Sequence, residues 1–488
     1  MAQTFSSAEV VGSHLKRFPV RHLVAGELQG SERSFGVINP ATGEVAAQCP
    51  EASREQLDEA VRLARLAQPS WAATPIAVRR AALLEFARRM VEHEEELAGI
   101  ITLEQGKPLG AALAEVRRAA QVLGQVVSIS LDDEVLRDDA NGRVELRYRP
   151  LGVVGAIAPW NMPIVLSVPK ITHALYTGNA LVLKPSPYTP LATLRLGEIA
   201  ADLFPAGVLS ILAGFDKLGQ GMSEHAGIDK ISFTGSIATG KKVMASAAVN
   251  LKRLTLELGG NDAAIVLEDA DVAAIAQRLF DGAFVNSGQV CMAIKRLYVH
   301  ESLYDAACEA LTRIAAAVRV GDGFNPKTQL GPVQNKAQFE IVKGVLQDTQ
   351  ATPAVRILTG GRPIEGPGYF VPPTLVADIA EGTRLVDEEP FGPVLPIIRY
   401  KEVADAVQRA NRTSYGLGAS VWGRNTRRAT EVAGQLEAGM VWVNRHVGAD
   451  PTVPFGGAKQ SGIGREYGIH GLRAYMEAMS LFMPPSVR

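Results

Sequence analysis

The stretch "KISFTGSIATGKKV" at residues 230–243 runs from a short apolar strand through a glycine turn into a helix. Its Gly235, Gly240 and Lys241 have nearly the spacing of the phosphate-binding loop of nucleotide triphosphatases. That loop also needs a Ser or Thr hydroxyl after the lysine to hold Mg²⁺, and Lys242 stands in its place. A glycine turn between strand and helix still forms an anion site, because free backbone N–H groups and the positive end of the helix dipole face it. The stretch therefore predicts an α/β unit that binds a phosphate without being a triphosphatase.

The same alternation of short apolar strands and helices fills the preceding hundred residues. Strands are expected within 152–159, 180–186 and 207–214, and helices within 163–178 and 191–204. Apolar runs bounded by Gly or Pro predict a parallel sheet covered by helices on both faces. Ligands in such sheets bind at the carboxyl ends of the strands, where "PWN", "LKPS" and "FTGS" all lie. We therefore expect three loops to converge on one crevice.

The flanking segments carry other patterns. Residues 53–125 have apolar positions at intervals of three and four and are expected to be helical. Residues 126–150 alternate in polarity around a turn at Asn141-Gly142, which predicts a hairpin that can project from the domain. A second alternating series over 262–440, with a helix at 302–318, predicts a second α/β domain.

Length and composition exclude several classes of protein. The 488 residues predict two or three domains, and 47% hydrophobic with 21% charged residues is ordinary for a globular protein. The net charge of -1 gives no field that attracts nucleic acid or anionic lipid, so neither is an expected partner. The N-terminus does not resemble a secretory signal, and no apolar run is long enough to span a membrane, so a cytoplasmic location is expected.

The cysteines and histidines show no metal-ligand spacing, and no metal site is expected. Cys291 lies in "FVNSGQVCMAIKR", among small and polar residues, which makes it a candidate nucleophile as much as a packed thiol. Cys308 is the contrasting case, because it occupies an apolar helix position typical of an inert, buried thiol. Cys49 has no evident partner.

Three further polar residues end strands of the first series, and each has two interpretations. Glu257 in "LTLELGGN" is either a solvated strand-end residue or a buried carboxylate with the raised pKa of a general base. Asn161 either caps the following helix or points at a developing oxyanion. Lys184 is either a surface lysine or a ligand of a ribose or phosphate.

Seven motifs together identify a family resemblance. "PWNMP", "LKPS", "FTGS", "LELGGN", "GQVC", "EEPFGPV" and "PFGGAKQSGIGRE" occur in the order of the aldehyde dehydrogenase superfamily, which the chain resembles from about residue 22 to 482. The resemblance implies an α/β fold with a Rossmann-type cofactor domain, an α/β catalytic domain and a small β oligomerisation element. It implies domains at 1–125 with 147–258 and at 259–440, with oligomerisation elements at 126–146 and 468–488.

The resemblance also implies the chemistry. Cys291 is expected to attack an aldehyde, with the oxyanion held by Asn161, and to pass through a thiohemiacetal and a thioester as hydride goes to NAD(P). Glu257 is expected to activate the water that hydrolyses the thioester, which indicates the branch that does not transfer acyl groups to coenzyme A. Lys170 and Glu466 are expected to support the catalytic residues. The alternative is a catalytically silent dinucleotide-binding protein, which the presence of these residues disfavours.

For the cofactor, the resemblance implies NAD, with NADP also accepted. Glu389 and Phe391 are expected at the nicotinamide ribose and ring, and the other expected contacts are Trp160, Lys184, Gly235, Ser236 and Leu258. Many relatives that prefer NAD carry a glutamate three residues after the ribose lysine, where this chain has Pro187. Lys241 and Lys242 are then expected to be solvated helix residues.

The remaining expectations concern substrate and assembly. Semialdehyde oxidisers of the family tend to carry an arginine that binds the substrate carboxylate, and this chain has Pro169 in its place. One expected contact with a carboxylate-bearing substrate is therefore missing. Side chains at Val165, Val290 and Met292 are expected to make the substrate tunnel apolar, and Arg445 and His446 are expected at its mouth. The small-molecule aldehyde is the expected partner, within a homodimer or homotetramer.

Overall fold

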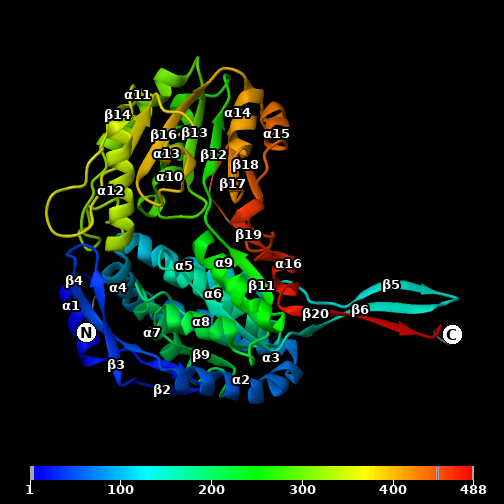
Figure 1. The fold of residues 1–488 in the computed structure, drawn as a ribbon. Coiled ribbons are helices and arrows are strands. Elements are labelled where there is room, and N and C mark those ends of the chain that lie inside the picture. Colours follow the sequence, from blue (N-terminus) through cyan, green and yellow to red (C-terminus); the bar gives the residue numbers. More distant parts are fainter. Residues whose placement is uncertain (1–4, 447, 449, 486–488) are drawn as a thin grey trace.

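The computed structural model describes residues 5–446, 448 and 450–485. Two large sheets, each covered by helices, lie one above the other, and a thin β-ribbon projects from one side (Figure 1). The α/β class expected from the alternating sequence is confirmed. No helix in the described ranges is long and apolar enough to cross a membrane.

The first sheet has the order β19-β11-β10-β7-β8-β9-β1-β2. Its central strands, from β11 to β9, are parallel, and the edge strands β19, β1 and β2 are antiparallel to their neighbours. The buried strands read as continuous apolar runs because both faces are covered. The strands are β1 (His22–Val24), β2 (Glu27–Gln29), β7 (Val153–Ile157), β8 (Ala180–Lys184), β9 (Leu209–Ile211), β10 (Lys230–Thr234), β11 (Arg253–Glu257) and β19 (Gly462–Ile463).

Alternate residues of these strands pack into two different cores. Val154 and Ala156 join the core formed with α3 to α7, whereas Val153 and Ile157 join the core formed with α2, α8 and α9. This two-residue alternation places helices on both faces, as expected. The covering helices are α2 (Arg54–Ala73), α3 (Ile76–Glu92), α4 (Glu94–Gln105), α5 (Leu109–Val126), α6 (Pro163–Tyr176), α7 (Leu191–Ala200), α8 (Asp216–Glu224) and α9 (Ile237–Ala247).

The second sheet has the order β14-β15-β16-β13-β12-β17-β18 and is parallel except for the β14–β15 pair. α10 and α11 pack on one face, and α12, α14 and α15 on the other. Its strands are β12 (Asp262–Val266), β13 (Ile294–His300), β14 (Arg356–Thr359), β15 (Thr374–Ala377), β16 (Val394–Tyr400), β17 (Gly418–Trp422) and β18 (Met440–Val443). Its helices are α10 (Val272–Phe284), α11 (Tyr304–Ala316), α12 (Lys336–Ala351), α13 (Arg384–Asp387), α14 (Val403–Asn411) and α15 (Thr426–Ala433).

The projecting ribbon contains the predicted hairpin. β5 (Glu134–Asp139) pairs with β6 (Gly142–Pro150), and β20 (Met476–Met483) adds to the other edge of β6 (Figure 1). Asp139 pairs with Gly142, so the loop residues are 140 and 141, and Gly142 is the first residue of β6 with φ +125°. Only glycine adopts that conformation readily, which explains its place beside the turn.

The remaining elements cover the edges of these sheets. α1 (Ala8–Arg17) packs against α4, and β3 (Arg33–Asn39) pairs with β4 (Glu44–Glu51) as a separate hairpin. α16 (Gly468–Arg473) leads into β20. β19 and α16 bring the chain back from the second sheet to the first, so the C-terminal segment contributes to the region between the two sheets.

Candidate active site

Two cavities meet at a cysteine between the two sheets. The larger, of about 690 Å³, and the smaller, of about 240 Å³, are both lined by Asn161, Leu166, Glu257 and Cys291. Asn161 follows β7, Glu257 ends β11, and Cys291 lies in the loop before β13. The carboxyl ends of β7 and β11 therefore meet at the thiol. Of the three loops expected to converge, "PWN" and "FTGS" line the smaller cavity, whereas "LKPS" is not among the lining of either cavity.

The loop that carries Cys291 has a strained backbone. Asn286 and Ser287 are both left-handed, with φ of 53° and 57°, which costs on the order of 1–3 kcal/mol per residue. Side-chain hydrogen bonds hold this conformation: Asn286 Nδ2 donates to the carbonyl of Asn161 at 3.0 Å, and Ser287 Oγ donates to that of Gly331 at 2.8 Å. The loop is thus fixed to the elements that frame the larger cavity.

Glu257 is the buried carboxylate beside the thiol. Burial, and then the negative charge of Glu466, raise its pKa to about 8. Among the described residues, its Oε1 accepts no hydrogen bond. Burial and the charge of Glu257 likewise raise the pKa of the Cys291 thiol. The solvated alternative for Glu257 is wrong, and its environment favours proton acceptance near neutral pH.

Lys170 and Glu466 form a buried ion pair whose charges act on Glu257. Lys170 Nζ lies 2.7 Å from Glu466 Oε1 and donates to Ser232 Oγ at 3.1 Å. Glu466 lines the larger cavity. The two residues therefore lie together, and the lysine fixes the orientation of the glutamate that faces the cavity.

Asn161 does not cap the following helix. α6 has Met162 at its N-cap, without a side-chain hydrogen bond there. The N–H groups of Ile164 and Val165 instead donate to Glu115 Oε1, at 2.9 and 3.2 Å. The Asn161 amide donates one hydrogen bond to the carbonyl of Gln289 at 2.9 Å, which leaves a second N–H of the amide for the cavity.

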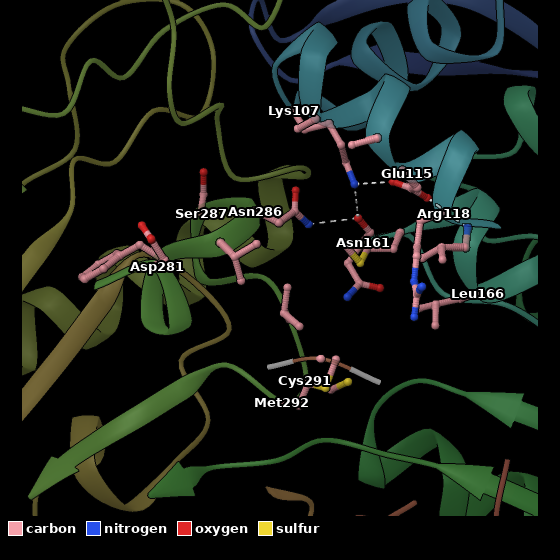
Figure 2. Close-up of a pocket in the computed structure, with 18 of the residues that line it drawn as sticks. Lys107, Glu115, Arg118, Asn161, Leu166, Asp281, Asn286, Ser287, Cys291 and Met292 are labelled. Atoms are coloured by element: carbon pink, nitrogen blue, oxygen red, sulfur yellow. Dashed lines mark hydrogen bonds and ion pairs between the residues drawn. The ribbon is translucent and has the colours of Figure 1, made fainter. Parts of the chain in front are cut away.

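Lys107 and Glu115 form an ion pair beside the backbone of Asn161 (Figure 2). Lys107 Nζ lies 2.5 Å from Glu115 Oε2 and donates to the carbonyl of Asn161 at 3.2 Å. The predictions from the sequence include neither residue. One signal was present: Glu115 shares the apolar stripe of α5 with Ala112, Val116 and Ala119, where a carboxylate needs a buried partner.

The smaller cavity contains most of the expected cofactor residues. Trp160, Gly235, Ser236, Glu389 and Phe391 line it. The rings of Trp160 and Phe391 meet edge to face with centroids 5.3 Å apart. Ser236 is the N-cap of α9 and accepts from the N–H of Thr239, so the predicted strand–turn–helix is present. Burial raises the pKa of the Glu389 carboxyl.

Lys184 at the end of β8 and Leu258 directly after β11 belong to the first sheet and are not among the residues that line this cavity. Lys184 is buried, its Nζ donates to the carbonyl of Pro185 at 3.1 Å, and burial lowers its pKa to about 8. The surface alternative for Lys184 is therefore wrong. Leu258 is buried against Gly240 of α9. Lys241 and Lys242 are exposed on α9, as expected.

Side chains of the larger cavity are mostly apolar. Val165, Val290 and Met292 line it as expected. The expectation for His446 is wrong, because its ring is buried beneath the cysteine loop with contacts of 2.8 Å to Ser420 Oγ and 2.9 Å to the carbonyl of Met292. Polar side chains are nevertheless present at the edges, and Figure 2 shows Arg118 and Asp281 on opposite sides of the view.

The other two cysteines are buried away from this site. Cys308 lies on α11, where burial raises its pKa to about 11. Cys49 lies on β4, and burial raises its pKa as well. Within the residues that the structure describes, no group of His, Cys, Asp or Glu side chains is arranged to hold a metal ion.

Comparisons with known proteins agree over nearly the whole chain. Residues 28–481 match the model of the aldehyde dehydrogenase family. The aldehyde dehydrogenase LUC3 of Fusarium sp. is 37% identical over 465 residues, which cover 95% of this chain and 98% of the relative. A Bacillus cereus aldehyde dehydrogenase, solved as a point mutant, has a TM-score of 0.94 at 35% identity, covering 97% of this chain and 98% of its own. Betaine aldehyde dehydrogenase of Staphylococcus aureus, solved with NAD⁺, has a TM-score of 0.94 at 32% identity, covering 99% and 98%.

Proposed function

The chain belongs to the aldehyde dehydrogenase family, and from this premise we propose how its own residues oxidise an aldehyde with NAD(P). The observation that carries the proposal is the junction of two cavities, at which Cys291, Glu257 and Asn161 meet. The larger cavity takes the aldehyde and the smaller one takes the nicotinamide end of the cofactor. Both reactants then reach the same sulfur atom.

Cys291 is the nucleophile. Glu257 accepts the thiol proton, and the thiolate forms a C–S bond to the aldehyde carbon, giving a thiohemiacetal. The second N–H of the Asn161 amide and the Cys291 backbone N–H hold the oxyanion. Burial raises the pKa of the Cys291 thiol, so the thiol needs a base, and the raised pKa of the Glu257 carboxyl makes its carboxylate a stronger proton acceptor for that thiol.

The residues of the smaller cavity fit a nicotinamide dinucleotide. Glu389 offers a buried carboxylate for ribose hydroxyls, Trp160 and Phe391 offer aromatic surface, and Gly235 with Ser236 leads into the N-terminus of α9. Lys184 and Leu258 extend the site toward the adenosine end. When bound, the cofactor supplies the two-electron acceptor that converts the thiohemiacetal to a thioester. NAD is the proposed cofactor, with NADP also accepted.

Glu257 first releases the thiol proton to solvent, and the regenerated carboxylate then acts as general base toward water. Its Oε1, without a hydrogen-bond partner among the described residues, accepts the proton as the water oxygen attacks the thioester carbon. The C–S bond breaks, the carboxylic acid leaves, and the Cys291 sulfur takes up the proton that Glu257 accepted from the water. Lys170 and Glu466 are positioning residues in this step, because the ion pair fixes a negative charge that keeps Glu257 basic.

The apolar lining indicates an apolar aldehyde substrate. We also propose the domain division given above, with the projecting ribbon joining copies of the chain into a homodimer or homotetramer. The β5–β6–β20 ribbon leaves Leu136 and Phe482 exposed at 57% and 73%, which is the kind of surface that another chain covers.

The deciding experiment measures NAD(P)H absorbance with aliphatic, aromatic and semialdehyde substrates, together with the acid product. Stoichiometric acid and NAD(P)H without coenzyme A support the proposal. A requirement for coenzyme A, or cofactor binding without turnover of any aldehyde, would contradict it. The second of these outcomes would favour the catalytically silent alternative.

A further inference from the structure

A buried lysine lies directly beneath the cysteine loop. Lys295 is the second residue of β13, and its side chain is only 3% exposed. Its Nζ donates to the carbonyl of Val290 at 2.6 Å and to that of Cys291 at 2.8 Å. The same Nζ lies 3.4 Å from Glu389 Oε1 and 5.8 Å from the centre of the Phe391 ring. Two carbonyls of the loop and one carboxylate of the smaller cavity therefore share one ammonium group.

The first of these carbonyls belongs to the peptide unit that contains the Cys291 N–H. A trans peptide is planar, so fixing the Val290 C=O also fixes the opposite direction of the Cys291 N–H. A cation on the carbonyl oxygen polarises the peptide and strengthens its N–H as a donor. Its charge also favours the thiolate form of Cys291. Lys295 thus acts on both groups that the nucleophile presents to an aldehyde.

The contact with Glu389 connects this loop to the cofactor side. Glu389 Oε1 also accepts from the N–H of Gly260 at 3.3 Å, which holds the carboxylate between the two sheets. Three donors on the ammonium match three acceptors, and this arrangement is costly to change in a buried site.

We propose that Lys295 is a positioning residue that orients and polarises the Val290–Cys291 peptide and couples it to Glu389. This role rests on the proposed function of Cys291 as the nucleophile. Lys295 touches no reacting atom and acts through the loop. The other titratable groups that interact with it are the Cys291 thiol, Asp262 from β12 and His446 from the segment after β18, in addition to Glu389, and Glu257 from β11 faces the same thiol.

The test replaces the ammonium and measures the thiol directly. In Lys295→Met, the rate of Cys291 alkylation by iodoacetamide is followed from pH 6 to 10 in the full-length protein. We expect the alkylation midpoint to move to higher pH, because a nearby positive charge is lost. We also expect kcat to fall by about 10-fold. This loss is smaller than the ~10²–10³-fold that removal of an oxyanion-hole donor costs, because the Cys291 N–H itself remains.

Two further variants separate this role from general stability. Lys252→Met is the matched control, since Lys252 is also buried and its Nζ donates to a backbone carbonyl, that of His225, at 2.7 Å. It is expected to leave the alkylation midpoint unchanged. Lys295→Arg keeps the charge, so its alkylation midpoint should shift less than that of Lys295→Met. If Lys295→Met does not fold, Lys295→Gln takes its place, because its amide retains a donor without the charge.

The outcomes distinguish this inference from the proposed function. An unchanged midpoint and kcat in Lys295→Met, with aldehyde oxidation intact, would overturn the role of Lys295 alone. A midpoint that moves equally in Lys252→Met would overturn it too. If the unaltered protein oxidises no aldehyde, the proposed function fails, and the alkylation midpoint still decides whether Lys295 acts on the thiol.

Discussion

Glu257 gives the proposed hydrolysis a defined dependence on pH. Only the ionised carboxylate accepts a proton, and its pKa is raised to about 8. A group with this pKa is ionised to about one tenth at pH 7 and about nine tenths at pH 9, so the rate of deacylation should rise about tenfold between them. The rate should then level off above pH 9, because nearly all of the carboxylate is ionised.

The assay must isolate deacylation, since the Cys291 thiol also has a raised pKa and makes acylation pH-dependent. Para-nitrophenyl acetate meets this need: a burst of nitrophenolate reports acylation of the thiol, and the later linear phase reports deacylation. In Glu257→Gln the linear phase should be slower by ~10²–10⁴-fold and insensitive to pH. The burst should keep its amplitude but form more slowly, because Glu257 also accepts the thiol proton during acylation.

A third protein tests the cause of the raised pKa. Glu466→Gln removes the second largest cause, a negative charge, so the midpoint of the linear phase should move to lower pH. A flat profile between pH 6 and 9 in the unaltered protein would refute the assignment of Glu257 as base. A midpoint that stays in place in Glu466→Gln would refute the electrostatic part of the reasoning.

Three other predictions follow from the site. Cys291→Ala should abolish aldehyde oxidation while NAD still binds in a fluorescence titration, whereas Cys308→Ala should retain activity; turnover in the first variant would exclude Cys291 as nucleophile. Pro187→Glu should raise the ratio of kcat/KM for NAD to that for NADP, because a carboxylate accepts ribose hydroxyl hydrogen bonds and repels a 2′-phosphate; an unchanged ratio would place the discrimination elsewhere. Phe482→Asp should lower the mass measured by light scattering if the ribbon joins subunits, and an unchanged mass would argue against that role.

The sequence predicts the central strands and helices of the first sheet because buried parallel strands read as short apolar runs between Gly and Pro, and for the second sheet it predicts the α/β class and the helix at 302–318. It does not predict how distant segments complete a sheet. β19 is only Gly462–Ile463, yet it pairs with Leu256 and Glu257 about two hundred residues earlier. Two residues carry no periodicity, so this edge strand follows from tertiary contacts alone.

Of the residues at the site, the sequence likewise points to some and misses others. Cys291, Glu257 and Asn161 were noticed because their residue types are unusual in their local settings, but each setting left a second interpretation open, and their expected roles came from the family resemblance. Lys295 and Lys107 were not noticed, since a lysine near a strand or helix end is most often solvated. His446, expected at the mouth of the tunnel, was also missed, because the sequence does not show that both of its ring nitrogens have partners beneath the loop.

The arrangement of charges explains why Glu257 remains a base. Glu257, Glu466 and Lys170 are all buried, so the carboxylate that the ammonium of Lys170 contacts is the one whose charge it stabilises most. Lys170 Nζ donates to Glu466 Oε1 at 2.7 Å, and Glu257 keeps an oxygen without a partner among the described residues. Had Lys170 paired with Glu257 instead, the pKa of Glu257 would fall and the carboxylate would hold no proton from water. The neighbouring ion pair thus stabilises the buried charge of Glu466 while leaving the reacting carboxylate basic.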